Sequence, residues 1–500
     1  MTNRTKFFYN GLLLSAVGLC VRTVGLIFGA FVSRAIGAEG TGLYTLIMTV
    51  YSFAVTFAGS GISLTVTRLV ASAIGEGKED EVGGILRGAL FYSLAFSMLA
   101  SAVLFLGAGA FAERLLFDYR SRISLRILSF SLVPTALCAV FSGYFVGIKR
   151  VSCNAAVQIA TQFTKIALTV LLVLKMSEYG TEAAVAALCI GISSSEIISF
   201  LLMILQFLLA RVKKRNNNKR GVIMKPVAGM ALPLAFSAYI RSGLLTLEHI
   251  LIPKRLSDRG ENVSEALSAY GTLHGMALPL ILYPISPLSS FSGMLVPEFA
   301  ENKGGACRMR RIATEVMNNT LAYAVAIAVF LYVFSEELGY IVYNSYEAGI
   351  YIALIAPIVP IMYLDHVTDS MLKGIGEHVY SMWVNISDSF LSVILVWFLI
   401  PKLGIAGYAL VIIVMEAYNF ILSILRLRKR VAFDISVRKS LLIPGAAAFL
   451  ASYLSKRLFV MNGTVTTPLW LVMKIVFAIS IFLGTFMILS KVTTRVKKTA

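Results

Sequence analysis

The sequence predicts an all-α integral membrane protein with about 14 transmembrane helices, arranged as two pseudo-symmetric six-helix lobes plus two C-terminal helices. Two observations predict the membrane. Hydrophobic residues make up 58% of the 500 residues, charged residues only 14%, and the mean hydropathy is +0.80, whereas a soluble domain carries roughly 25% charged residues. Apolar runs long enough to cross a bilayer also recur along the chain. So much apolar surface excludes a soluble enzyme, a secreted disulfide scaffold and a disordered protein.

The apolar runs form successive spans joined by short loops, none of which is long enough to fold as a separate domain. The first run follows Arg4 and Lys6 as in a signal peptide. It lacks an A-x-A cleavage site, so we expect a retained first span. Several spans are long and contain Pro or Gly, which predicts tilt and kinks. The predicted spans are 11–36, 43–73, 84–110, 124–148, 152–175, 183–210, 226–253, 266–297, 311–335, 347–373, 378–400, 404–427, 438–459 and 467–490.

Lys and Arg are unevenly distributed among the loops. With the N-terminus inside, the cytoplasmic segments hold more than twice as many Lys and Arg as the outer loops. The positive-inside rule therefore predicts a multi-pass protein with both termini cytoplasmic. The formal charge of +19 needs no nucleic acid partner on this interpretation. The strongest basic run, 211–220, is interpreted as a cytoplasmic linker, with binding of anionic lipid as the alternative.

Internal similarity predicts the domains. Residue pairs with one constant separation along the chain include Gly147 with Gly374 and Phe163 with Phe390. Both halves begin on the same side after six spans, so they are predicted to be parallel repeats, an architecture that places a substrate site between the halves and suits alternating access. The predicted domains are an N-terminal lobe (1–210), a basic linker (211–225), a C-terminal lobe (226–430) and the last two helices (431–500).

Ionisable residues inside spans are the candidate functional residues. Each costs roughly 2.5–3.5 kcal/mol on insertion scales, so such groups normally face a cavity or a partner. The candidates are Arg22, Arg68, Lys165, Glu196, Arg241, Glu248, His249, Asp365, His366, Asp369, Asp388 and Glu416.

Arg22 and Arg241 come from the first span of each half and would present two cations to one central space. Two guanidinium groups suit a diphosphate, which they grip bidentately and without losing their charge. The alternative is that each arginine pairs with an intramembrane acid, for example Arg241 with Glu248, seven residues further on nearly the same helical face. For Arg34 and Arg68, near span ends, the alternative is snorkelling to the interface.

Three acids, Asp365, Asp369 and Asp388, are a candidate proton or sodium site, as in an antiporter; ordinary hydrogen bonding between helices is the alternative. No metal site is expected, because the four histidines lack ligand spacing. The five cysteines have no C-x-x-C spacing and are interpreted as membrane-core residues. No G-x-x-x-x-G-K-[ST] motif occurs. We therefore expect neither a cofactor nor nucleotide hydrolysis, and a transporter rather than an enzyme.

Four segments in order carry a family resemblance: 33–44 (SRAIGAEGTGLY), 61–68 (GISLTVTR), 270–280 (YGTLHGMALPL) and 295–299 (LVPEF). With the span count, they make the chain resemble the multidrug/oligosaccharidyl-lipid/polysaccharide (MOP) exporter superfamily over nearly its whole length. The resemblance is to the polysaccharide-transporter branch that includes the stage V sporulation B proteins, and more distantly to the MurJ lipid II flippases.

The resemblance implies two six-helix lobes around a central cavity and two further helices, which in relatives form a groove for a lipid tail; Lys474 is compatible with such a groove. Against the cavity arginines of the lipid II flippases, Arg22 and Arg34 match basic positions. Other polar positions of that pattern fall on Phe28, Val55, Ser60 and His274. The cavity is therefore expected to be less basic, which favours the sporulation-protein branch.

These arguments predict a bacterial plasma-membrane flippase for a polyprenyl-pyrophosphate-linked oligosaccharide, a peptidoglycan precursor or a polysaccharide repeat unit, with service in sporulation implied by the resemblance alone. The expected partners are this substrate and membrane lipids, the expected state is a monomer, and the energy source is the membrane potential or a Na⁺ or H⁺ gradient. The alternatives are a cation-coupled multidrug antiporter and a non-transporting scaffold or lipid-linked transferase. The predicted substrate-binding residues are Arg22, Arg241, Arg68, Arg34, Glu248 and His274, and the possible ion-coupling residues are Asp365, Asp369 and Asp388.

Overall fold

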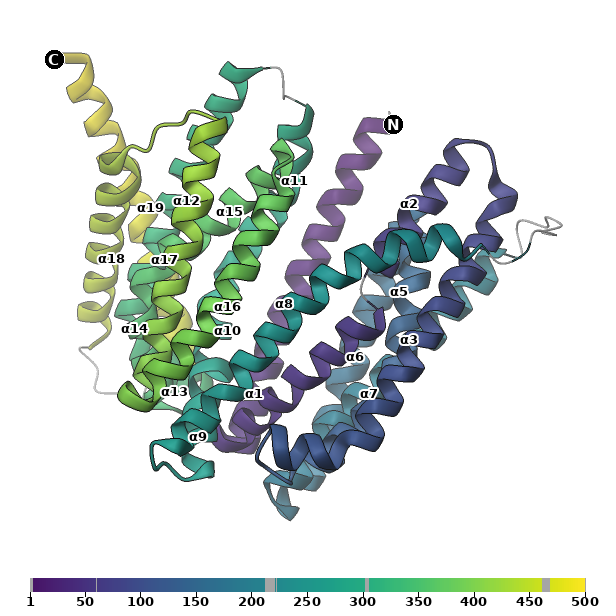
Figure 1. Ribbon diagram of the computed structural model, residues 1–500. Helices are drawn as coiled ribbons and strands as arrows, with labels where there is room; N and C mark the ends of the chain where they lie inside the picture. Colours follow the sequence, from purple (N-terminus) through teal and green to yellow (C-terminus); the bar gives the residue numbers. More distant parts are fainter. Residues whose placement is uncertain are drawn as a thin grey trace. The chain divides into compact units, whose positions relative to one another are not determined.

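The computed structural model describes residues 3–59, 61–211, 221, 223–301, 305–460 and 468–499, and every regular element among them is helical (Figure 1). The first half contains α1 (Asn3–Gly59), α2 (Ile62–Gly75), α3 (Val82–Ala110), α4 (Ser121–Ser129), α5 (Leu132–Gly147), α6 (Val151–Met176), α7 (Thr181–Arg211) and α8 (Lys225–Asp258). The second half contains α9 (Val263–Tyr270), α10 (Leu278–Leu282), α11 (Ser286–Glu301), α12 (Ala306–Val333), α13 (Ser335–Tyr343), α14 (Tyr346–Ile355), α15 (Val359–Ile375), α16 (His378–Leu403), α17 (Ile405–Arg430), α18 (Ile443–Val460) and α19 (Pro468–Thr499).

Short irregular turns extend several of these helices. The 3₁₀ turns are η1 (Glu79–Glu81), η3 (Ser177–Tyr179), η5 (Tyr283–Ile285) and η6 (Ala356–Ile358), and the π-helical turns are η2 (Phe111–Leu115), η4 (Gly271–Ala277) and η7 (Arg438–Leu442). Pro284 lies in η5 and Pro357 in η6, and proline and π-helical turns are usual causes of helix kinks. Helices α4 and α5 meet at a bend of 41°, so a kink in the predicted fourth span is present.

The described residues of the predicted spans lie on helices apart from short turns, so the all-α membrane fold is confirmed. By length and hydropathy, nine helices in the described residues can cross a membrane, or up to 11 if each of two bent pairs is one span. The predicted number is higher for two reasons. Most of the first predicted span and the whole of the second lie in one 58-residue segment, Gly18–Gly75. The last two lie on α18, which ends in the polar residues Ser455, Lys456 and Arg457, and on α19, whose described apolar part is Trp470–Phe486.

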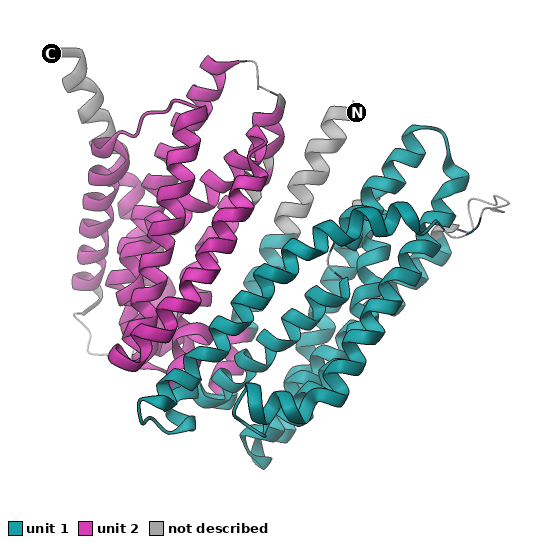
Figure 2. Cartoon of the chain, viewed as in Figure 1, with its two compact units in different colours: residues 1–28, 35–268 teal, residues 29–34, 269–500 magenta. Residues whose placement is uncertain are grey.

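The chain forms two compact units (Figure 2). Unit 1 comprises Met1–Phe28 and Ala35–Ser268, and unit 2 comprises Gly29–Arg34 and Ala269–Ala500. These units are defined by contacts between residues, whereas the predicted lobes are defined by internal sequence similarity. The lobe limits therefore stay a prediction. Most of the predicted basic linker, 212–220 and 222, lies outside the described residues.

A break inside α1 separates its two spans. Gly37 has φ +73° and ψ −178°, a conformation that interrupts the helix and that residues with a Cβ rarely adopt. Directly after the break, Glu39 pairs with Arg120 at 2.8 Å, and Arg120 also pairs with Asp118 at 2.7 Å. The hydrogen bonds that the Arg120 guanidinium donates to Asp118 raise the pKa of Arg120. This ion-pair network fixes the turn between α3 and α4 against the start of the second span.

The core of unit 1 brings α2, α3, α5 and α8 together. Ile62, Val66 and Val70 recur every four residues and form one buried face of α2, which packs against Ile85 and Ala89 of α3. Gly221 and Ile223, which precede α8, pass close to α3 at Gly84 and Gly88. A Cβ on Gly88 would lie 2.3 Å from the carbonyl oxygen of Ile223, so only glycine permits this approach.

The core of unit 2 is formed by α11, α12, α15 and α17, with Phe299, Met317, Val367 and Met371 fully buried. An extended strap (431–436) joins α17 to the last two helices and lies along α12. Asn318 of α12 holds it: the Asn318 amide donates to the carbonyl of Asp434 at 2.7 Å and its oxygen accepts from the backbone of Ser436 at 2.8 Å. The strap thereby ties α18, which packs on α12 and α19, to unit 2 (Figure 1).

The glycine pair of the predicted repeat makes the same kind of contact in each unit. Gly147 of α5 lies against α2, where its Cβ would be 3.0 Å from Val70. Gly374 of α15 lies against α11, where its Cβ would be 2.7 Å from Phe299 and 3.0 Å from the carbonyl of Val296. Both glycines therefore allow two helices to approach closely.

The five thiols differ in exposure. Cys189 is buried, Cys138 and Cys153 are half-buried, and Cys20 and Cys307 are exposed. All five are free.

Candidate functional site

The predicted substrate arginines of unit 1 are exposed. Arg22 of α1, Arg68 of α2 and Arg241 of α8 all have exposed side chains in strongly apolar helices. Glu248, by contrast, is only 8% exposed. Arg241 forms no ion pair with any residue that the structure describes, so the alternative pairing of Arg241 with Glu248 is absent. An exposed, permanently charged group in an apolar helix requires water or an anion nearby.

Arg34 and His274 lie in unit 2. The Arg34 guanidinium donates a hydrogen bond to the carbonyl oxygen of Ile341 in α13, so this arginine holds protein backbone. His274 is half-buried in the π-helical turn η4, with its ring 5.4 Å from that of Tyr270. The structure thus places the predicted substrate-binding set in two units, with Arg22, Arg68, Arg241 and Glu248 in unit 1.

The predicted acids of unit 2 do come together. Asp365 of α15 interacts electrostatically with Asp369 of the same helix and with Asp388 of α16, and Glu416 of α17 interacts with Asp365 and Asp388. Asp369 already has two partners, because it pairs with Lys373 at 2.5 Å and accepts a hydrogen bond from Ser381. Among the described residues no three His, Cys, Asp or Glu side chains are placed to hold a metal ion.

Unit 1 contains a second polar cluster, formed by α1, α5, α6 and α7. The Tyr51 hydroxyl lies 2.7 Å from Ser131 Oγ, and Thr135 Oγ1 lies 3.2 Å from a carboxyl oxygen of Glu196. Lys165 of α6 interacts electrostatically with Glu196. Sequence reasoning found Glu196 and Lys165 as ionisable groups in spans but missed Tyr51, Ser131 and Thr135. The four-residue spacing of Ser131 and Thr135, which puts both hydroxyls on one face of α5, was the available signal.

A cavity of about 360 Å³ adjoins this cluster. Thr56 and Thr135 contribute its polar wall, and the remaining wall is apolar. The other lining residues, from α1, α5 and α8, are Val55, Ala58, Gly59, Leu132, Ala136, Ala139 and Ala238. Thr135 therefore lies between the cavity and the Glu196 carboxyl group.

The last two helices bury a cation. Lys474 of α19 is 6% exposed, and Ser455 of α18 donates to its backbone carbonyl at 2.9 Å. Ala447, Ala448 and Ala451 are fully buried on α18. These small residues let the two helices pack closely.

Comparison with known proteins gives one family and several relatives. The family described as "Polysaccharide biosynthesis protein" matches residues 7–303. Stage V sporulation protein B of Bacillus subtilis (strain 168) is 25% identical over 426 residues, which cover 82% of this chain and 81% of that protein. Sporulation protein YkvU of the same organism is 21% identical over 363 residues, covering 70% of this chain and 79% of that protein.

Two solved structures are similar along most of the chain. The lipid II flippase MurJ in its inward closed conformation has a TM-score of 0.71 at 15% identity, covering 97% of this chain and all of that chain. An inward-facing multidrug resistance MATE transporter of the MOP superfamily has a TM-score of 0.63 at 15% identity, covering 83% of this chain and 98% of that chain. The predicted superfamily resemblance is confirmed, and the fold is like those of MurJ and of MATE transporters.

Proposed function

Because the chain belongs to the polysaccharide biosynthesis protein family, whose members are multi-pass membrane transporters and not enzymes, we propose that it is a flippase for a polyprenyl-pyrophosphate-linked oligosaccharide. The match to that family over more than half of the chain carries the proposal. A transporter of this family with the fold of a lipid II flippase suits a substrate that has a polar head group and a lipid tail.

The exposed arginines support a diphosphate ligand. Arg241 is exposed in an apolar helix and has no ion pair among the described residues, and Arg22 is exposed on α1. Guanidinium groups stay charged in any membrane environment and bind phosphate oxygens through parallel hydrogen bonds. We therefore assign the pyrophosphate to Arg22 and Arg241, and expect Arg68 to contribute at the helix end. We assign Arg34 a structural role instead, because its guanidinium donates a hydrogen bond to the carbonyl of Ile341.

The mechanism follows from these assignments. The head group enters from the cytoplasmic side with its pyrophosphate at Arg22 and Arg241 while the tail stays in lipid. Alternating access then exposes the head group at the outer surface of a bacterial plasma membrane. Helix ends rich in Lys and Arg would face the cytoplasm throughout.

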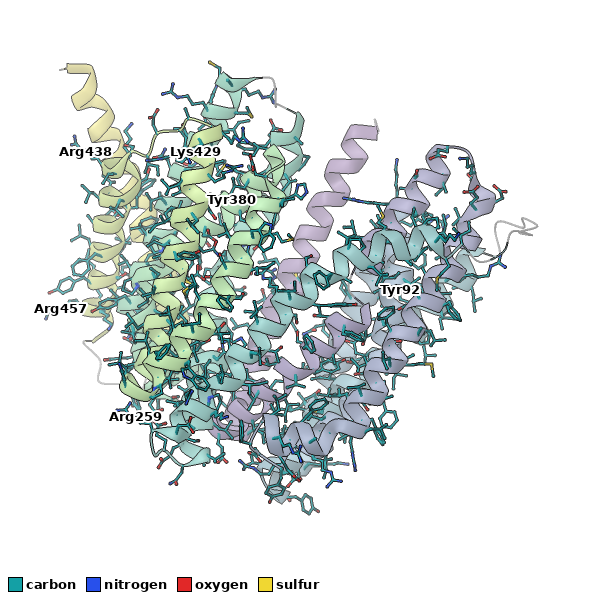
Figure 3. The ribbon with its side chains drawn as sticks, in the orientation of Figure 1. Tyr92, Arg259, Tyr380, Lys429, Arg438 and Arg457 are labelled. Carbon is teal, nitrogen blue, oxygen red and sulfur yellow. The ribbon has the colours of Figure 1, made fainter. Side chains whose placement is uncertain are left out.

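Native mass spectrometry of the protein, gently extracted from bacterial membranes, tests the substrate class. We expect a bound polyprenyl-pyrophosphate glycolipid in the wild type and its loss in Arg22→Ala and in Arg241→Ala, because each substitution removes a bidentate phosphate ligand, an effect on the order of tenfold or more in affinity for about 1.5–3 kcal/mol. Arg259→Ala is the matched control, since Arg259 is exposed in the turn after α8 and outside the proposed site (Figure 3).

Ordinary phospholipids alone, unchanged by the arginine substitutions, would contradict the proposal and favour the second candidate, a cation-coupled small-molecule antiporter. The clustering of Asp365 with Asp388 and Glu416 in unit 2 supports that candidate. It predicts dye efflux from vesicles that depends on sodium or protons and that Asp365→Asn abolishes while Arg22→Ala leaves it intact.

A further inference from the structure

The segment that joins α17 to α18 carries more cations than its acid can neutralise. Residues 428–442 contain three cations at the end of α17 and two in η7, against a single acid, Asp434. Asp434 is already paired, because Arg310 of α12 binds it at 2.8 Å. Arg430 is also paired, with Glu377 at 2.7 Å. The exposed cations of this segment that form no ion pair with any described residue are Arg428, Lys429, Arg438 and Lys439.

Hydrogen bonds to α12 fix the strap and η7 together. The Asn318 side-chain oxygen accepts from the backbone of Ser436 at 2.8 Å and from the hydroxyl of Ser440 at 2.7 Å. One turn earlier on α12, the Thr314 hydroxyl accepts from the backbone of Asp434 at 3.2 Å. The strap and the π-helical turn therefore form one ordered surface on α12.

The two groups of cations lie at the same end of unit 2. Figure 3 labels one member of each group, Lys429 in α17 and Arg438 in η7. The Arg428 guanidinium lies 5.4 Å from the ring centre of Phe433, a buried residue of the strap, which holds this cation beside the strap. Since no acid in the described part of the chain pairs with these side chains, they can bind an anion from outside the chain.

Exposed apolar side chains lie next to these cations in the sequence of η7. Val437 is 54% exposed and Leu442 60% exposed, and Leu441 is exposed as well, whereas Ser440 beside them is buried. The apolar surface continues along α18, which begins directly after η7; its exposed apolar residues are Phe449, Leu450, Tyr453, Leu454 and Leu458. Cations beside exposed apolar residues at the start of an apolar helix are typical of a segment at a membrane interface.

A membrane lipid accounts for both features. A soluble anion would satisfy the cations but would leave the leucines in water, whereas a phospholipid covers both kinds of side chain. We propose that the junction of α17, the strap and η7 binds an anionic phospholipid of the cytoplasmic leaflet. Its phosphate lies at Arg438 and Lys439, which bind phosphate through parallel hydrogen bonds and as a point charge, respectively. Its acyl chains run along Leu441 and Leu442 toward α18.

Native mass spectrometry of the purified full chain, titrated with phosphatidylglycerol in detergent, tests the site. The double variant Arg438→Gln/Lys439→Gln should bind the first lipid roughly tenfold more weakly than the wild type, because it removes both phosphate ligands. Ser440 is unchanged in this variant, so the contact of η7 with Asn318 remains. Phosphatidylcholine, which has no net charge, should bind equally to the variant and the wild type.

The matched control removes the same charge from the same end of unit 2. Arg308 and Arg311 are exposed cations of α12, and each has its own acid, at 2.9 Å and 3.0 Å. Arg308→Gln/Arg311→Gln should therefore bind phosphatidylglycerol as the wild type does. Equal weakening in both double variants would overturn the proposal, because the lipid would then respond to net charge and not to a site.

A second pair of measurements separates a lipid from a soluble or protein-borne anion. Leu441→Ser/Leu442→Ser should also weaken phosphatidylglycerol binding, because the acyl chains lose their apolar surface, and glycerol phosphate should not displace the lipid. Displacement by glycerol phosphate, or full binding in the leucine variant, would assign the cations to a soluble anion or an acidic protein instead. Arg22 and Arg241 are intact in all these variants, so failure here leaves the glycolipid experiment standing, and the reverse holds.

Discussion

At Gly374 the backbones of α15 and α11 approach so closely that there is no room for a side chain. A Cβ there would lie 2.7 Å from the Cβ of Phe299 and 3.0 Å from the carbonyl oxygen of Val296. Neither neighbour is the flexible end of a long side chain, and Phe299 is fully buried. One methyl group would therefore have to move a whole helix.

Gly374→Ala is expected to destabilise the protein by about 1–3 kcal/mol, the usual penalty for overpacking a well-packed core. Thermal unfolding in detergent, followed by fluorescence, measures the change. Gly293→Ala in α11 is the matched control, because no neighbouring atom lies within 4 Å of the position its Cβ would take. An equal melting temperature for both variants would show that α11 and α15 can separate at no cost.

At the scale of the element, Glu377 fastens the turn between α15 and α16 to the end of α17. Its carboxylate pairs with Arg426 at 2.8 Å and with Arg430 at 2.7 Å. Arg426 also lies 4.9 Å from the ring centre of Tyr380, which is labelled in Figure 3. Hydrogen bonding from Arg426, supported by Arg430, lowers the pKa of Glu377 below its ordinary 4.5.

This shift predicts a pH dependence. A carboxyl group whose folded pKa is lowered stabilises the fold above its unfolded pKa and ceases to do so as the pH falls through the folded value. Glu377→Gln should therefore lower the melting temperature at neutral pH, and the difference from the wild type should vanish as the pH falls below the ordinary 4.5. High salt should shrink the difference, because the pairs are partly exposed. Glu347→Gln, an exposed acid in the first turn of α14, is the control; an equal effect there would refute a specific role for Glu377.

At the scale of the whole molecule, cations gather at particular helix ends. In unit 2, Lys429 at the end of α17 and Arg438 in η7 lie at one end and Arg457 of α18 at the other (Figure 3). The same end as Lys429 also carries Arg428 and Arg430. This concentration supports the prediction that both chain termini are cytoplasmic.

Reporter fusions test that orientation. A fluorescent protein that matures only in the cytoplasm should fluoresce when fused to the C-terminus, since the positive-inside rule retains the basic ends there. The same reporter fused after Gly180, in the turn between α6 and α7 that is predicted to face outward, should stay dark. A dark C-terminal fusion with a fluorescent fusion after Gly180 would invert the predicted topology. The helices that carry Arg22 and Arg241 would then cross the membrane in the opposite direction.

The sequence was sufficient for the helices but only partly for the site. Hydropathy and Gly or Pro positions predict helices because lipid forces each span to satisfy its own backbone. Gly374 and Gly147, which the sequence pairs with each other, both lie where a neighbouring helix passes closely. Side-chain partners are different, since they depend on how helices turn against each other: nothing local shows that Arg34 reaches Ile341 or that Thr135 faces Glu196. Pairwise interactions across helices far apart in sequence leave no pattern in a single chain.

The five thiols differ in exposure, so the exposed ones can carry labels that report on motion within the chain. Cys20 belongs to unit 1 and Cys307 to unit 2, and these two are the exposed members of the set. Spin labels attached at these native positions would place one paramagnetic centre in each unit, while Cys138 and Cys153 are half-buried and Cys189 is buried. Electron–electron dipolar spectroscopy could then record how the interspin distance distribution changes on adding glycolipid or changing pH, with no engineered cysteine.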